Sequence, residues 1–203
     1  DLVGEKVYQK FGNQFPLLIK IIDANDWLSI QVHPDDELAK LRGIGNGKTE
    51  MWYILEADNE SSLISGFKKE VSKEEYIHRL ADKSLKEVLN FETVKKGDVF
   101  YMPAGRIHAL GPGILLAEIQ QTSDTTYRIY DWDRLDENGK SREMHIEEAM
   151  DAIDFKVEKS YKTDYEREKN KTVKIIETPY FCTNLIELDE PVTKDYGQLD
   201  SFV

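Results

Sequence analysis

The sequence predicts a mainly β fold, a sandwich or barrel of strands with a small helical insertion. Short apolar or alternating segments recur along the chain, separated by turns that contain Gly, Pro or Asn, and only one segment has a convincing helical pattern. With 203 residues, the chain is long enough to bury roughly 70% of its unfolded surface, so it needs no disulfide bonds to fold.

The first strands are the best marked. Residues 17–22 (LLIKII) form a continuous apolar run, which is typical of a strand buried on both faces. Residues 27–33 (WLSIQVH) alternate, so that Leu28, Ile30 and Val32 share one face, and Trp27, Ser29, Gln31 and His33 share the other. Further strands are expected at 50–55, 98–102, 114–120, 125–130 and 173–188.

Residues 72–90 have the pattern of a long helix. Ser72 and Glu75 form a capping box at its start. An approximate apolar stripe follows, made of Tyr76, Leu80, Leu85 and Leu89. Shorter helices are expected at 34–42 and 145–152.

The composition changes in the last third of the chain, which predicts a domain boundary. We expect residues 1–155 to form one domain that carries the helical insertion around 72–90. Residues 156–172 are highly charged and read as a linker or exposed loop. Residues 173–203 return to strand character and stop inside an apparent strand, so we expect them to begin a second, truncated domain.

Charge and cysteine content restrict the class of protein. A formal net charge of −12 argues against nucleic acid as a partner, because such binding relies on basic residues. No apolar run approaches the roughly 20 residues that span a bilayer, and we expect neither a membrane partner nor a secretory leader. The single cysteine, Cys182, is expected to be buried in a strand and fits a reducing, cytoplasmic setting. The sequence leaves the oligomeric state open.

Gln31 and His33 are the first candidate metal ligands. At positions i and i+2 of a strand, their side chains point to the same side, about 7 Å apart along the chain. An isolated pair of this kind is more often a solvated polar edge. Trp27 lies on the same face of the predicted strand, and an indole is less expected on a fully wet surface.

The most specific motif is GDVFYMPAGRIH at residues 97–108. Gly97, Pro103, Gly105 and His108 have the spacing G-x5-P-x-G-x2-H, which resembles the second conserved motif of the cupin superfamily. In such a motif the glycines and proline bend the chain sharply and return the histidine to the barrel interior as a metal ligand. The resemblance implies a cupin, a jelly-roll β-barrel, with a second cupin beginning near the C-terminus.

Departures from the usual cupin pattern point to one family. Gln31 replaces the first histidine of an H-x-H pair, and the carboxylate is displaced to Glu50. With FPLLIKIIDANDWLSIQVHPDD, GKTEMWYIL and MPAGRIHALGPGILLAEIQQTSDTTYRIYDWDR, the chain resembles the short bacterial form of type I phosphomannose isomerases. The resemblance implies one zinc ion per chain, held by Gln31, His33, Glu50 and His108. This mixed nitrogen and oxygen set would also accept manganese, iron or cobalt.

The same resemblance implies the positions that act on substrate. Arg128 matches the catalytic arginine of the family, and Glu118 and Lys48 are the candidates for the proton-transferring acid–base. Asp124 matches an acidic position that lines the pocket, and Ser29 shares a strand face with the predicted ligands; both are assigned to substrate binding. Without the resemblance, Arg128, Lys48 and Ser29 would be interpreted as surface residues.

The implied activity is metal-dependent aldose–ketose isomerisation. Mannose 6-phosphate and fructose 6-phosphate would interconvert through an enediol, so the expected partner is a small sugar phosphate. Two alternatives stay open: a metal-dependent cupin oxygenase, which the His108 motif alone would serve, and a non-catalytic sugar-binding cupin. Gln31 and the distant Glu50 count against the oxygenase, and intact acid–base candidates count against the binding module.

Overall fold

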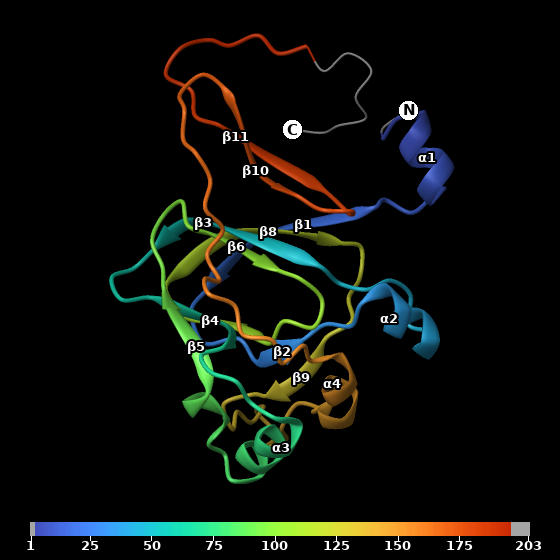
Figure 1. Ribbon diagram of the computed structural model, residues 1–203, viewed down its shortest axis with the longest axis vertical. Helices are drawn as coiled ribbons and strands as arrows, with labels where there is room; N and C mark the ends of the chain where they lie inside the picture. The colour runs from blue at the N-terminus through green and yellow to red at the C-terminus, as the bar shows by residue number, and fades with distance from the viewer. Residues whose placement is uncertain (1–2, 196–203) are drawn as a thin grey trace.

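Over residues 3–195, which the computed structural model describes, antiparallel strands form two facing sheets and a separate hairpin (Figure 1). Sheet A has the order β1 (Leu17–Ala24), β8 (Ile114–Gln121), β3 (Glu50–Ala57) and β6 (Val99–Met102). Sheet B has the order β5 (Leu89–Thr93), β4 (Ser62–Phe67), β7 (His108–Leu110), β2 (Ile30–Val32) and β9 (Tyr127–Tyr130). The two sheets curve around a common interior, so the predicted mainly β barrel is confirmed.

The alternation of residues 30–33 decides which side chains enter that interior. The predicted faces of Trp27 and Leu28 are wrong, because Trp27 packs in the cluster on the outer face of sheet B and Leu28 packs in the interior apolar cluster. Ile30 and Val32 point to the outer face of sheet B, where they pack in one cluster with Tyr76 and Ala149 from the covering helices. The other face of β2 therefore turns its polar side chains toward sheet A. Part of the interior is apolar and joins both sheets through Trp52, Phe100, Leu116, Leu63 and Leu110.

Short helices flank the barrel: α1 (Glu5–Phe11), α2 (Asp36–Arg42), α3 (Lys73–Ala81) and α4 (Ile146–Ala152). Ser72 caps α3 as predicted, with Oγ accepting a hydrogen bond from the Glu75 amide at 3.1 Å. The helix nevertheless ends at Ala81, so the prediction of one helix through residue 90 is wrong in its second half. Lys83 adopts φ +61°, which breaks the helix, and the chain continues as the 3-10 turn η1 (Leu85–Glu87) and strand β5.

Strand β1 is an edge strand and is not buried on both faces. Ile19 and Ile21 are 52% and 65% exposed, because the outer face of sheet A is only partly covered. The cover comes from the hairpin of β10 (Thr172–Glu177) and β11 (Cys182–Ile186), which accounts for the strand character expected at 173–188. Its Ile175 and Phe181 pack on Met51 and Val99 of sheet A.

The segment between the barrel and the hairpin lies against the barrel. Tyr161 is buried, and its hydroxyl donates a hydrogen bond to the Phe67 carbonyl at 2.7 Å. The division into two domains stays a prediction, and the end of the expected truncated strand lies outside the described residues. Cys182 is exposed and not buried as expected. No helix within residues 3–195 is both long enough and apolar enough to cross a membrane.

Candidate metal centre and active site

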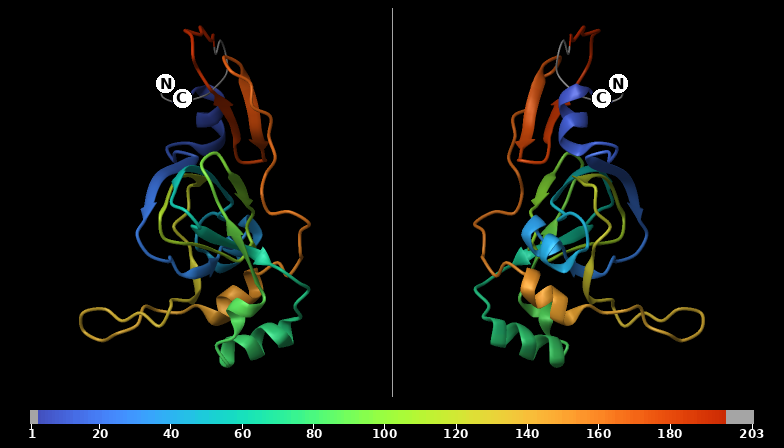
Figure 2. Two further views of the ribbon diagram at one scale, coloured as in Figure 1. Left: turned by 90° about the vertical axis from the view of Figure 1, so that its left-hand side faces the viewer. Right: turned by 90° about the vertical axis from the view of Figure 1, so that its right-hand side faces the viewer.

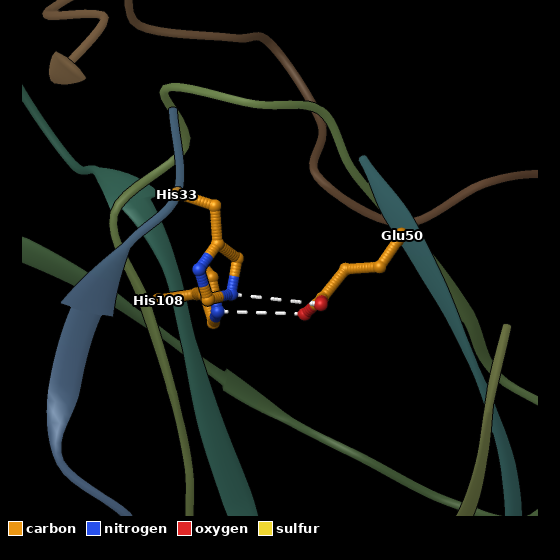
Figure 3. Close-up of side chains that lie close together, drawn as sticks. All are labelled: His33, Glu50 and His108. Atoms are coloured by element: carbon orange, nitrogen blue, oxygen red, sulfur yellow. Dashed lines mark ion pairs between the residues drawn. The ribbon is translucent and has the colours of Figure 1, made fainter. Parts of the chain in front are cut away.

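His33, Glu50 and His108 meet inside the barrel, with the histidines on one side and the carboxylate facing them (Figure 3). His33 Nε2 lies 3.5 Å from Glu50 Oε2, and His108 Nε2 lies 3.4 Å from Glu50 Oε1. Ligands about 2.1 Å from a tetrahedral ion stand roughly 3.4 Å from one another. The three side chains thus have the spacing that a single metal ion requires.

The fold brings these residues together from both sheets. His33 directly follows β2, Glu50 opens β3, and His108 opens β7. The bend within the 97–108 motif brings His108 close to His33. Gly105 has φ +87° at this bend, and its amide donates a hydrogen bond to the His33 carbonyl at 2.9 Å. The spacing G-x5-P-x-G-x2-H therefore carries the chain from β6 in sheet A to β7 in sheet B.

Backbone carbonyls orient both imidazoles. His33 Nδ1 lies 2.9 Å from the Thr125 carbonyl oxygen, and His108 Nδ1 lies 2.8 Å from that of Arg106. Because a carbonyl only accepts, each Nδ1 carries the proton and donates it, and each Nε2 turns its lone pair toward Glu50. Burial lowers the pKa of His108 to about 4 and holds the pKa of His33 well below its usual value. Both rings are therefore neutral, the state that binds metal.

Glu50 is fully buried, and burial raises its pKa to about 7, against the opposing effect of Lys48. Neither of its carboxylate oxygens accepts a hydrogen bond from residues 3–195. A buried carboxylate without hydrogen bonds is costly, and a bound cation removes that cost. The unsatisfied oxygens and the two neutral imidazoles together fit a divalent metal ion.

Lys48 and Gln31 complete the immediate surroundings. The Lys48 Nζ lies 3.1 Å from His33 Nε2 and 3.3 Å from Glu50 Oε2, so its ammonium group makes contacts that a metal cation would make. Gln31 Nε2 lies 3.3 Å from His108 Nε2, and its Oε1 accepts from Ser29 Oγ at 3.3 Å. Ligation through Gln31 Oε1 therefore requires a half-turn of the amide.

Glu118 lies farther along the interior and is joined to Lys20, a residue that sequence reasoning missed. Lys20 Nζ lies 2.7 Å from Glu118 Oε1, and the Trp52 indole donates to Glu118 Oε2 at 3.0 Å. The three residues are cross-strand neighbours in β1, β8 and β3. A lone lysine inside the apolar run LLIKII was the signal that could have found it.

Arg128 lies on β9, directly opposite Gln31 in the strand register. Its Nη1 donates to the Glu143 carbonyl at 2.8 Å, while the buried Nε has no acceptor within residues 3–195. Asp124 is exposed in the loop between β8 and β9. In the described part of the chain, no hydrogen bond or ion pair joins it to the other predicted site residues.

Comparisons with known proteins agree with this geometry. The catalytic-domain model of type I phosphomannose isomerase matches residues 1–61. Over 147 residues, the chain is 48% identical to the mannose-6-phosphate isomerase of Streptococcus mutans, covering 70% of this chain and 46% of that protein. The chain belongs to the type I phosphomannose isomerase family.

Other members of the family extend the match. The mannose-6-phosphate isomerase ManA of Bacillus subtilis is 43% identical over 173 residues, which cover 84% of this chain and 55% of ManA. A crystal structure of the mannose 6-phosphate isomerase from Bacillus subtilis superposes with a TM-score of 0.77 at 38% identity, covering 84% of this chain and 55% of that one. The predicted cupin fold is thereby confirmed. The chain spans about half the length of the curated phosphomannose isomerases it matches.

Proposed function

We propose that the protein containing this chain is a zinc-dependent mannose-6-phosphate isomerase. The buried cluster of His33, Glu50 and His108 carries the proposal, because it offers metal ligands inside a barrel whose relatives bear that name. The substrates would be the sugar phosphates mannose 6-phosphate and fructose 6-phosphate. A cytoplasmic setting, which the solitary Cys182 favours, is part of the same proposal.

His33, Glu50 and His108 would hold the zinc ion, with Gln31 as the fourth ligand once its amide turns. Two imidazole nitrogens and carboxylate and amide oxygens are ordinary zinc donors. When bound, the ion supplies Lewis acidity toward the sugar oxygens. The Nδ1 contacts to the Thr125 and Arg106 carbonyls support this role, because they keep the rings fixed and their Nε2 atoms available.

The chemical step is a proton transfer between neighbouring carbons. A base removes the C2 proton of the open-chain aldose, and the electron pair forms an enediol with C1. A proton returned to C1, with the hydroxyl proton moved from O2 to O1, gives the ketose. Glu118 and Lys48 are the proposed acid–base groups, and both are buried beside the interior.

The basic groups of the interior would handle the negative charge of substrate and intermediate. The buried Nε of Arg128 has no acceptor within residues 3–195, and the fixed positive charge of the guanidinium would offset charge on the developing enediolate. Lys20 adds a second cation at the partly exposed edge of the barrel, where it forms an ion pair with Glu118. Local cations of this kind are what an anionic substrate needs in a chain of net charge −12.

The test is a coupled assay that follows fructose 6-phosphate formed from mannose 6-phosphate by the intact protein. Activity should disappear with a chelator and return when zinc is restored. Chelator-insensitive activity, or no turnover in a zinc-loaded intact protein, would refute the proposal. Oxygen uptake by the same metal-loaded sample would instead identify a cupin oxygenase.

A further inference from the structure

The buried carboxylate of Asp131 connects the two ends of the loop between β9 and α4. Residues 131–145 leave β9, project away from the two sheets and return to α4 (Figure 2). Asp131, on the outgoing limb, is only 2% exposed. It accepts hydrogen bonds from Arg134 on the same limb and from Arg142 on the returning limb.

The bond between Asp131 and Arg142 joins the two limbs. Arg142 Nε donates to Asp131 Oδ2 at 2.7 Å, and Arg142 Nη2 donates to Oδ1. This is the bidentate arrangement that fixes a guanidinium in orientation as well as in position. The tip of the loop has its own turn, in which the Asp136 amide donates to the Lys140 carbonyl at 2.9 Å.

The returning limb is also what holds Arg128. The residue after Arg142 is Glu143, whose carbonyl accepts from Arg128 Nη1 at 2.8 Å. Two residues later, the His145 amide donates to the Arg128 carbonyl at 2.8 Å, and His145 Nδ1 accepts from the Arg128 amide at 3.3 Å. Both the main chain and the guanidinium of Arg128 thus depend on residues 143–145.

We propose that Asp131 and Arg142 are positioning residues that fix Arg128 through the Glu143 carbonyl and the His145 backbone. The inference rests on the catalytic role proposed for Arg128. Without the bidentate pair, the returning limb would lose its ionic contact with Asp131, and the Glu143 carbonyl that accepts from the Arg128 guanidinium would no longer be held in place. A displacement of about 1 Å in a group that stabilises a transition state is enough to cost roughly a hundredfold in rate.

The first test needs no activity. Hydrogen exchange at the His145 amide is compared between the intact wild-type protein and Arg142→Ala, whose side chain is 51% exposed in the wild type. We expect exchange about tenfold faster in the variant, because the limb opens locally. The matched control is Lys83→Met, which removes the ion pair with Asp133 near the base of the same loop and touches neither Asp131 nor Arg128. Unchanged exchange in Arg142→Ala would overturn the proposal.

The second test is a double-mutant cycle on turnover. Arg142→Ala should lower kcat by about tenfold to a hundredfold, Arg142→Lys by less, and Lys83→Met not at all. In an Arg128→Ala background, Arg142→Ala should have no further effect, because it acts through the missing guanidinium. An equal loss in both backgrounds would show that Arg142 is merely structural. If wild type itself is inactive, the proposed function fails, while the exchange experiment still decides whether Arg142 holds the loop on Arg128.

Discussion

Gln31 and His108 are direct cross-strand partners in β2 and β7, although 77 residues separate them in the sequence. Their Nε2 atoms lie 3.3 Å apart, and β9 places Arg128 opposite the same glutamine. One register therefore aligns two proposed metal ligands, His108 and Gln31, with the proposed catalytic cation Arg128 across three neighbouring strands. A register slip of one residue in β2 would turn Gln31 out of the interior, so the site depends on the pairing of this three-residue strand.

Removing a ligand should remove the metal. We expect His108→Ala and Glu50→Ala to lose stoichiometric zinc after dialysis, measured as zinc per chain by elemental analysis. His78→Ala is the matched control, because His78 is an exposed histidine on α3, outside the cluster. Zinc content that stays at one per chain in both ligand variants would contradict the assignment. Chelation of wild type should lower the melting temperature, since the folded state loses a bound ligand.

Lys48 should oppose metal binding by its charge. Its Nζ lies 3.1 Å and 3.3 Å from atoms of His33 and Glu50, so a dication bound there would be repelled by the ammonium group. Lys48→Met keeps the stem and removes the charge. We expect it to release zinc to a competing chelator several-fold more slowly than wild type, whatever happens to turnover. Faster release would mean that Lys48 supports the ligands and does not compete with the ion.

Arg128→Ala should lower turnover without lowering the amount of bound zinc. Its guanidinium contacts the Glu143 carbonyl and none of the three clustered ligands within the described residues. We expect turnover to fall by about 10²–10³-fold, as for other fixed donors to a developing anion, while bound zinc stays unchanged. Loss of zinc in this variant would instead make Arg128 part of the framework of the metal site.

The sequence was sufficient to place those site residues whose position follows from local spacing. The G-x5-P-x-G-x2-H motif located His108, and alternation placed Gln31 and His33 on one face of a strand, although it wrongly placed Trp27 beside them. Glu50 followed only from family resemblance, because the α2 insertion removes any fixed spacing from His33. Lys20 was missed, since nothing local shows that a lysine in an apolar run reaches Glu118 across the β1–β8 pair.

The errors in the fold have physical causes of the same kind. The apolar stripe of residues 72–90 did mark buried positions, because Tyr76, Leu85 and Leu89 are all buried. The periodicity continued across a break at Lys83, where a residue with positive φ ends the helix, so one predicted helix became a helix, a 3-10 turn and a strand. Tertiary packing, and not local pattern, decided that region.

Stability should depend on pH through Asp131. Burial alone would raise the pKa of this carboxyl, but the hydrogen bonds from Arg142 and Arg134 outweigh it, so the pKa lies below its usual value. A depressed folded-state pKa gives stability that is present above the unfolded pKa, about 3.9, and is lost as pH falls through the folded value.

Asp131→Asn is therefore expected to cost about 2 kcal/mol at pH 7 and progressively less below about pH 4. Urea unfolding at several pH values measures the difference, with Asp124→Asn as the control because that aspartate is exposed. If Asp131→Asn lowers the free energy of unfolding by the same amount at every pH, the loss does not come from the charge of Asp131.

Gly105 should resist substitution more than Gly139, another glycine with positive φ. It has φ +87°, and an added Cβ would lie 3.0 Å from the Ala152 carbonyl oxygen and 3.2 Å from Asp154 Cβ. Gly139 is the matched control, with φ +76° and nothing within 4 Å of an added Cβ. Both alanine variants carry backbone strain of about 1–3 kcal/mol, but only Gly105→Ala must also push the 152–154 segment away from the bend beside His33. We expect chemical denaturation to show a larger loss of stability for Gly105→Ala than for Gly139→Ala, and zinc to be retained less well by Gly105→Ala. Equal losses of stability with unchanged zinc content would rule out a role for this close approach in shaping the metal site.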